Sequence, residues 1–214
     1  MRCQDILDKI EARYPRKYAC DWDNVGLLAG RSTKEVKKIL LSLDATDEVV
    51  RMAAEGGYDM LITHHPMLFS AIKRVTDQDM NGRRLLELIH NDISYYAMHT
   101  NYDTRGMADL AARLMGLTEC AVLEEVKDGE GIGRVGKLPH PMTLRECGEQ
   151  VKVAYGIPNV RLFGDPDTQV SLVGICPGAG KSTMPLALGF GCDVYITGDI
   201  DHHTGIDAVD QGMC

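Results

Sequence analysis

The sequence lacks any Cys-x-x-Cys pair, although it contains seven cysteines. They are odd in number and scattered along the chain: Cys3, Cys20, Cys120, Cys147, Cys176, Cys192 and Cys214. A disulfide framework or a thiolate zinc site would need paired or closely spaced cysteines. We therefore expect free thiols in a reducing, cytoplasmic compartment.

Long apolar runs and an excess of positive charge are also missing. No apolar segment approaches the roughly 20 residues that span a bilayer, and residues 1–5 contain no apolar signal core. The net charge is −8, from 23 Lys and Arg against 31 Asp and Glu. We therefore expect no membrane association and no general nucleic-acid binding.

What is present is an ordinary globular composition, 44% hydrophobic and 25% charged over 214 residues, enough for one large domain or two small ones. Strand and helix patterns alternate between residues 36 and 98, which predicts a right-handed strand–helix–strand array. After residue 117 the rhythm changes. We expect an α/β fold with mixed or parallel sheets and helices on their faces, in domains of residues 1–117 and 118–214.

Local patterns add further elements. Helical spacing predicts a helix over residues 3–13, and a short strand is expected at 160–163. Residues 18–27 are expected to form a loop that holds the only Trp of the chain. We favour a structural role for Trp22, whereas Asp23 and Asn24 either occupy turn positions or line a binding crevice.

Two buried strands of the predicted parallel sheet, at residues 58–62 and 93–98, are followed by metal-type ligands. The carboxyl ends of parallel strands form the binding crevice of such sheets. His64 and His65 would point to opposite faces of a regular strand, but Pro66 forces a turn that lets both face the crevice. The side chains expected to converge there are His64, His65, His99 and Asp103.

Imidazole and carboxylate ligands suit zinc, iron, manganese or nickel, and the sequence does not choose among them. The adjacent histidines can serve two neighbouring ions, which Asp103 can bridge. Two such ions, roughly 3.5–4 Å apart, can activate water and stabilise an attacked oxygen, which would make a hydrolase site. A single His at a strand end is usually structural, but two in a row beside a His-Thr-Asn-x-Asp cluster favour metal binding.

Other candidates have competing interpretations. Asp44 either orients a metal-bound His or begins the helix that follows, and the second role is favoured. Gly178 and Gly180 either present backbone N–H groups to an anion or form a tight turn. ATP hydrolysis is not predicted, because Ile175 stands where a P-loop requires glycine.

Together these motifs resemble the NIF-three-like dinuclear metal proteins, whose bacterial members are often labelled GTP cyclohydrolase I type 2 homologues. The resemblance spans nearly the whole chain and rests on Trp22-Asp23-Asn24-Val25-Gly26-Leu27, Thr63-His64-His65-Pro66, His99-Thr100-Asn101-Tyr102-Asp103, Gly178-Ala179-Gly180 and Thr197-Gly198-Asp199. It implies two linked α/β layers that form a metal cleft, two divalent ions, and a ring-shaped homo-oligomer such as a hexamer.

By this resemblance His64, His65 and Asp103 would be metal ligands, and His99 would lie close to the ions. Asn101, His202 and His203 would line the cleft. Family members continue with a further strand whose His and Glu complete the metal site, whereas this sequence ends at Cys214. Either the sequence is a truncated version or the site is incomplete. A chain without these ligands is expected to bind metal weakly and to have a weakened core, and we do not assign His202 and His203 as replacements.

The resulting hypothesis is a metal-dependent hydrolase that acts on a small, nucleotide-like substrate. In a GTP-cyclohydrolase-type reaction the purine imidazole carbon would be attacked. Fold and motif do not fix a reaction, so two alternatives stay open. One is a ring-forming scaffold or interaction protein that ions stabilise without catalysis, and the other is a metal chaperone.

Overall fold

The computed structural model describes residues 1–214 and divides into two compact units, Met1–Tyr102 and Asp103–Cys214. Each unit contains a four-stranded mixed sheet, with strand orders β1-β4-β3-β2 and β5-β6-β7-β8. The predicted α/β class is confirmed. None of the helices combines the length and the apolar character of a membrane span.

Three parallel strands form the body of the first sheet. They are β2 (Ile39–Ser42), β3 (Met60–Thr63) and β4 (Ser94–Ala97), joined by α2 (Asp47–Glu55) and α3 (Met80–His90). Both β3 and β4 are buried along their whole length, which explains why their sequences are mostly apolar. The predicted strand–helix–strand array is therefore confirmed.

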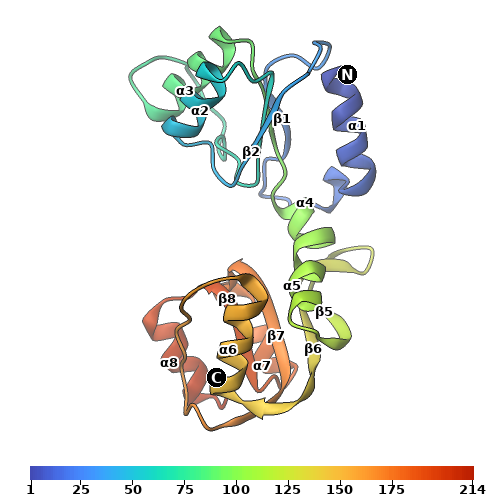
Figure 1. Cartoon of the computed structure of the whole chain (residues 1–214), viewed down its shortest axis with the longest axis vertical. Helices are drawn as coiled ribbons and strands as arrows, with labels where there is room; N and C mark the ends of the chain where they lie inside the picture. Colours follow the sequence, from blue (N-terminus) through green and yellow to red (C-terminus); the bar gives the residue numbers. More distant parts are fainter. The chain divides into compact units, whose positions relative to one another are not determined.

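Helices cover both faces of this sheet (Figure 1). The side chains of Leu88 and Tyr95 belong to the core under α2 and α3. On the opposite face, α1 (Cys3–Arg13) packs through Leu7 in a core that includes Tyr96. Tyr95 and Tyr96 reach opposite cores because neighbouring strand residues alternate between faces.

The fourth strand of this sheet was not expected from the sequence. Residues Gly26–Ala29 form β1, antiparallel to β4, after a short 3-10 turn η1 (Arg16–Tyr18). The predicted loop over 18–27 therefore gives way to a strand at Gly26. Pairing of Gly26 with Ala97 brings this loop beside the carboxyl end of β4.

In the second unit, antiparallel pairing links β5 (Thr118–Lys127), β6 (Glu130–Thr143) and β7 (Gln169–Ala179). A fourth strand, β8 (Val194–Asp199), is parallel to β7. Its helices are α5 (Ala108–Leu114), α6 (Leu144–Tyr155), α7 (Met184–Gly189) and α8 (His202–Asp210).

Two cores hold these helices to the sheet. One combines side chains of α5 and α6 with Val173 and Ile175 of β7, and the other combines α7 and α8 with Cys176. Ala111 and Ala112 of α5 belong to the first of these cores. Thus α5 packs with the second unit, although the division predicted at residue 117 would separate it from that unit.

The predicted strand at 160–163 is wrong, because this segment forms no strand. Its apolar residues instead cover glycines of the helices. Leu162 is the side chain that a Cβ at Gly148 of α6 would meet, and Phe163 is the one that a Cβ at Gly205 of α8 would meet. The apolar pattern thus reflects packing on helices.

Close pairing of β1 and β4 predicts a selective effect of alanine at Gly30. This residue has φ +93°, and a Cβ would lie 2.6 Å from the Cα of Ser94. We expect Gly30→Ala to lower the free energy of unfolding by about 2–4 kcal/mol, from backbone strain and overpacking together. Urea denaturation measures this change.

Gly57→Ala is the matched control. Gly57 also has a positive φ, +61°, but nothing lies within 4 Å of its Cβ position. It should cost only the backbone strain, about 1–2 kcal/mol. Equal losses at both positions would show that the approach of β1 to β4 contributes nothing.

Candidate metal centre

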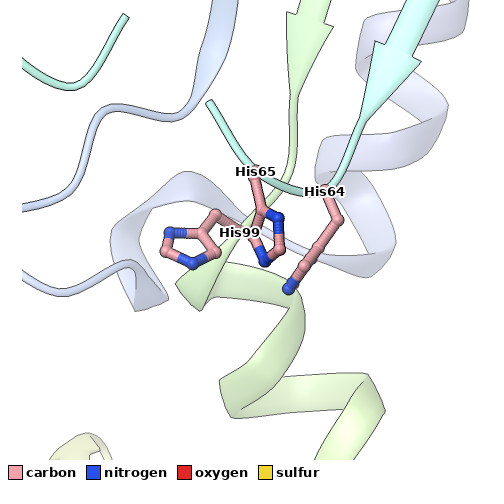
Figure 2. A group of neighbouring side chains, drawn as sticks. All are labelled: His64, His65 and His99. Atoms are coloured by element: carbon pink, nitrogen blue, oxygen red, sulfur yellow. The ribbon is translucent and has the colours of Figure 1, made fainter. Parts of the chain in front are cut away.

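Three histidines come together at the carboxyl ends of β3 and β4 (Figure 2). His64 and His65 follow β3 directly, and His99 follows β4. One ring nitrogen of each lies within 4.8 Å of the others, and the closest ring centroids, those of His64 and His65, are 4.9 Å apart. The group could hold a metal ion, and the predicted convergence of these three residues is observed.

Each of the three rings is oriented through its Nδ1 atom. The contacts are His64 Nδ1 to the Met98 carbonyl oxygen at 2.9 Å, His65 Nδ1 to Asp44 Oδ1 at 2.8 Å, and His99 Nδ1 to Asp23 Oδ1 at 3.0 Å. A carbonyl or carboxylate oxygen only accepts hydrogen bonds, so Nδ1 carries the proton in each neutral ring. The lone pair then lies on Nε2, the form in which imidazole binds metals.

Asp44 orients His65 and does not cap α2. The cap is Thr46, whose hydroxyl accepts a hydrogen bond from the backbone N–H of Val49 at 3.2 Å. The favoured capping role of Asp44 is therefore wrong, because its carboxylate is hydrogen-bonded to His65 instead, and its role beside a metal-bound His stays a prediction. Two residues near the strand end could each have capped the helix, and the threonine does so.

The carboxylate of Asp23 orients His99 as that of Asp44 orients His65, but the side chain of Asp23 is fully buried. Its carboxylate accepts hydrogen bonds from His99 and from both the backbone N–H and the hydroxyl of Thr100. Burial opposes ionisation, but these hydrogen bonds outweigh it and lower the pKa of Asp23 to about 2. Asp23 thus belongs to the candidate site, although the sequence left its role open, and the Trp22-Asp23-Asn24 motif was the only signal for it.

His64 is the histidine whose titration is most altered. Burial, and to a smaller extent the neighbouring His99 and His65, lower the pKa of His64 to about 4, although the hydrogen bond to Met98 acts in the opposite direction. The ring is therefore neutral at physiological pH. A neutral ring is ready to bind a cation without first losing a proton.

Two aromatic rings adjoin the histidine group. Trp22 is 61% exposed and stacks on Phe69, with ring centroids 5.9 Å apart. The ring planes of Trp22 and Phe69 are steeply inclined to that of His99, at 72° and 75°. The expectation that Trp22 is purely structural does not account for this exposure beside the candidate site.

The remaining residues of the His-Thr-Asn-x-Asp motif have different surroundings. Asn101 lies in the short helix α4 (Thr100–Tyr102), is buried, and donates a hydrogen bond from Nδ2 to the Tyr14 carbonyl oxygen at 2.9 Å. It therefore holds the end of α1. Asp103 begins the second unit and the π-helical segment η2 (Asp103–Met107), and its role as a ligand stays a prediction.

The candidates of the second unit do not form a comparable group. His202 and His203 are the first residues of α8, with exposed rings 5.6 Å apart between centroids. Asp201 caps this helix and pairs with Lys181 at 2.7 Å. Their place in a cleft stays a prediction.

The glycine-rich turn after β7 is held internally. The backbone N–H of Gly180 donates to the Thr197 hydroxyl at 3.0 Å, and a Cβ at Gly180 would collide with the side chains of Thr197 and Tyr195. Gly178 has φ +73° and open space around its Cβ position. The short α7 follows. These contacts favour the tight-turn interpretation over an anion site.

Comparisons with known proteins show which sequences this chain is similar to. Residues 1–214 match the family described as Duf34/NIF3 (NGG1p interacting factor 3). A Clostridium perfringens protein named GTP cyclohydrolase 1 type 2 homolog is 35% identical over 217 residues, which are 100% of this chain and 83% of the relative. A Streptococcus pneumoniae protein of the same name is 33% identical over 219 residues, 100% of this chain and 82% of the relative.

Solved structures of similar proteins align with the whole chain. A Staphylococcus aureus hypothetical protein aligns with a TM-score of 0.86 at 30% identity, over 100% of this chain and 84% of that one. A Bacillus cereus protein related to NIF3 aligns with a TM-score of 0.90 at 24% identity, over 100% and 86%. The second likeness concerns the fold alone.

The proton positions in the histidine group can be observed directly. In the neutral form of each of the three rings, we expect long-range ¹H–¹⁵N spectra of the metal-free protein to show the proton on Nδ1 and the lone pair on Nε2. His64 should titrate near pH 4, compared with an ordinary value of 6.5. A proton on Nε2 in any ring that is neutral would contradict the arrangement.

The lowered pKa of His64 also determines how the stability of the protein changes with pH. Folded His64 binds a proton less readily than the unfolded chain does, so lowering the pH favours unfolding. Its contribution to stability is present above pH 6.5 and is lost as the pH falls toward about 4. Unfolding followed across this range, with His64→Gln as the comparison, isolates the contribution.

The buried carboxylate of Asp23 predicts a large loss on truncation. Asp23→Ala leaves the donors of His99 and Thr100 without their acceptor, so we expect the free energy of unfolding to fall by about 2–4 kcal/mol. Glu35→Ala is the control, because Glu35 pairs with Lys37 on the surface and should change stability by less than about 0.5 kcal/mol. Similar small changes in both variants would refute the central role of Asp23.

Proposed function

Because the chain belongs to the Duf34/NIF3 family, we propose that it binds divalent metal at His64, His65 and His99 and acts as a metal-dependent hydrolase on a small, nucleotide-like substrate. The observation that carries this proposal is that the proton of each histidine ring lies on Nδ1. All three rings donate a hydrogen bond from Nδ1 to a fixed acceptor, which leaves the Nε2 lone pairs for a cation.

The residues fit a divalent transition metal. Imidazole nitrogen is a common ligand of zinc, iron, manganese and nickel, and three protein ligands leave a position for water or substrate in a catalytic site. A bound ion would supply Lewis acidity and a lowered pKa of water. The carboxylates of Asp44 and Asp23 hold the rings of His65 and His99 and increase their basicity.

Two ions per chain are part of the proposal. Neighbouring His64 and His65 could be shared between two ions, and the resemblance implies Asp103 as the bridging carboxylate. A carboxylate has two oxygens and four lone pairs, so it suits that role. The metal content per chain distinguishes one ion from two.

The nucleotide-like substrate and the assembly rest on less direct support. Relatives at 33–35% identity carry the name GTP cyclohydrolase 1 type 2 homolog, which favours a purine nucleotide as the first compound to assay. A ring-shaped homo-oligomer agrees with the exposed apolar residues of the edge strand β2, among them Leu41 and the adjoining Leu43. Exposed apolar edge strands are typical of contacts between chains.

Removal of one ring tests the proposal. We expect His64→Ala to lower zinc or manganese affinity by roughly 100-fold or more, since even partners behind the ligands contribute 10–100-fold. Hydrolysis of GTP and other nucleoside triphosphates should be lost in parallel, while the mass of the assembly is retained. Metal analysis, turnover assays and light scattering measure the three quantities.

His140→Ala is the matched control, because His140 is an exposed histidine on β6. It should leave all three quantities unchanged. If His64→Ala instead dissociates the assembly, the ions are structural and the scaffold alternative holds. If the unaltered protein binds metal but hydrolyses none of the nucleotides, the hydrolase part of the proposal fails.

A further inference from the structure

Two of the few aromatic side chains of this protein are exposed together beside the histidine group. The chain has one Trp and three Phe, and Trp22 and Phe69 are 61% and 49% exposed. Burial of such rings is strongly favourable. Because both rings stay exposed beside the histidine group, the protein lacks the stabilisation that their burial would provide.

The planes of the two rings are nearly parallel. Trp22 and Phe69 stack with their planes 15° apart, and their centroids lie 5.9 Å and 5.8 Å from that of His99. A flat ligand ring stacked on either of them would be roughly parallel to both and would lie next to His99. It would thus be held close to the candidate metal ligands.

The loops that bear the rings are fixed before any ligand arrives. Asp23, the residue after Trp22, is hydrogen-bonded to His99 and Thr100. Asn24 donates a hydrogen bond from Nδ2 to the carbonyl oxygen of Leu68, the residue before Phe69, at 2.5 Å. One polar pair thus ties the tryptophan loop both to the histidine segment and to the phenylalanine loop, and such preorganisation reduces the entropic cost of binding.

We propose that Trp22 and Phe69 form a stacking platform for the planar, nucleobase-like ring of the ligand bound at the histidine group. This inference rests on the proposed function, since it names the class of molecule that the same site recognises. A nucleobase stacks favourably on aromatic side chains through its π-face. Two rings offer too little area for a stable protein interface, which usually needs about 1,000 Å².

The single tryptophan makes the platform directly observable. Fluorescence of Trp22 in the zinc-loaded protein is titrated with guanosine 5′-monophosphate and, separately, with ribose 5-phosphate, which lacks the base. We expect saturable quenching by the nucleotide and none by the sugar phosphate. Quenching by both, or by neither, would overturn the proposal.

Substitutions at Phe69 separate stacking from other causes of quenching. Phe69→Leu should raise the dissociation constant of the nucleotide roughly 5- to 150-fold, the range expected when one base–aromatic contact is lost. Phe69→Tyr retains a ring and should bind as the unaltered protein does. Phe190→Leu is the control, because Phe190 is 48% exposed on the second unit, and it should have no effect.

The outcomes distinguish this proposal from the metal proposal. If Phe69→Leu retains zinc and binds the nucleotide unchanged, the platform is refuted and metal binding stands. If the protein binds no zinc, yet quenching occurs and weakens in Phe69→Leu, the platform stands and the metal proposal fails. If Phe69→Leu alters only the mass of the assembly, the rings belong to a contact between protein chains and the platform is refuted.

Discussion

The buried carboxylate of Asp23 is the group on which the histidine site and the aromatic loop both depend. It accepts hydrogen bonds from Nδ1 of His99 and from the backbone N–H and hydroxyl of Thr100. An isolated carboxylate in this position would be costly, so the bonds must form together. The same contact therefore selects the tautomer of His99, begins the short helix after it, and fixes the loop that bears Trp22.

The strand ends explain how two adjacent histidines can face one another. The backbone N–H groups of His64 and His65 still bond to the carbonyl oxygens of Ser42 and Leu43, beyond the end of β3. A regular strand would send their side chains to opposite faces. Here the chain bends at His64 and His65, and both rings lie in one group. Sheet pairing holds the backbone while the bend brings the side chains together.

Much of the fold and part of the site could be predicted from local pattern. Continuous apolar runs identified β3 and β4, and the rule for parallel sheets brought their histidines together. Long-range contacts were beyond such reasoning. Asp23 and His99 are 76 positions apart. Asp44 and Thr46 were both plausible helix caps, and only the structure shows which residue turned toward His65.

The dipeptide His-His occurs twice in this chain, and the difference between the two copies shows what makes a site. Behind His64 and His65 stand acceptors that fix each Nδ1 proton. His202 and His203 are exposed at the start of α8, where neither ring has a hydrogen-bonded acceptor, and the nearby carboxylate of Asp201 is engaged by Lys181 and Thr204. Without such acceptors nothing fixes the orientation or tautomer of a ring, and the entropic cost of ordering it would oppose metal binding. The acceptors behind the rings, more than the histidines themselves, therefore distinguish a candidate metal centre from a polar helix start.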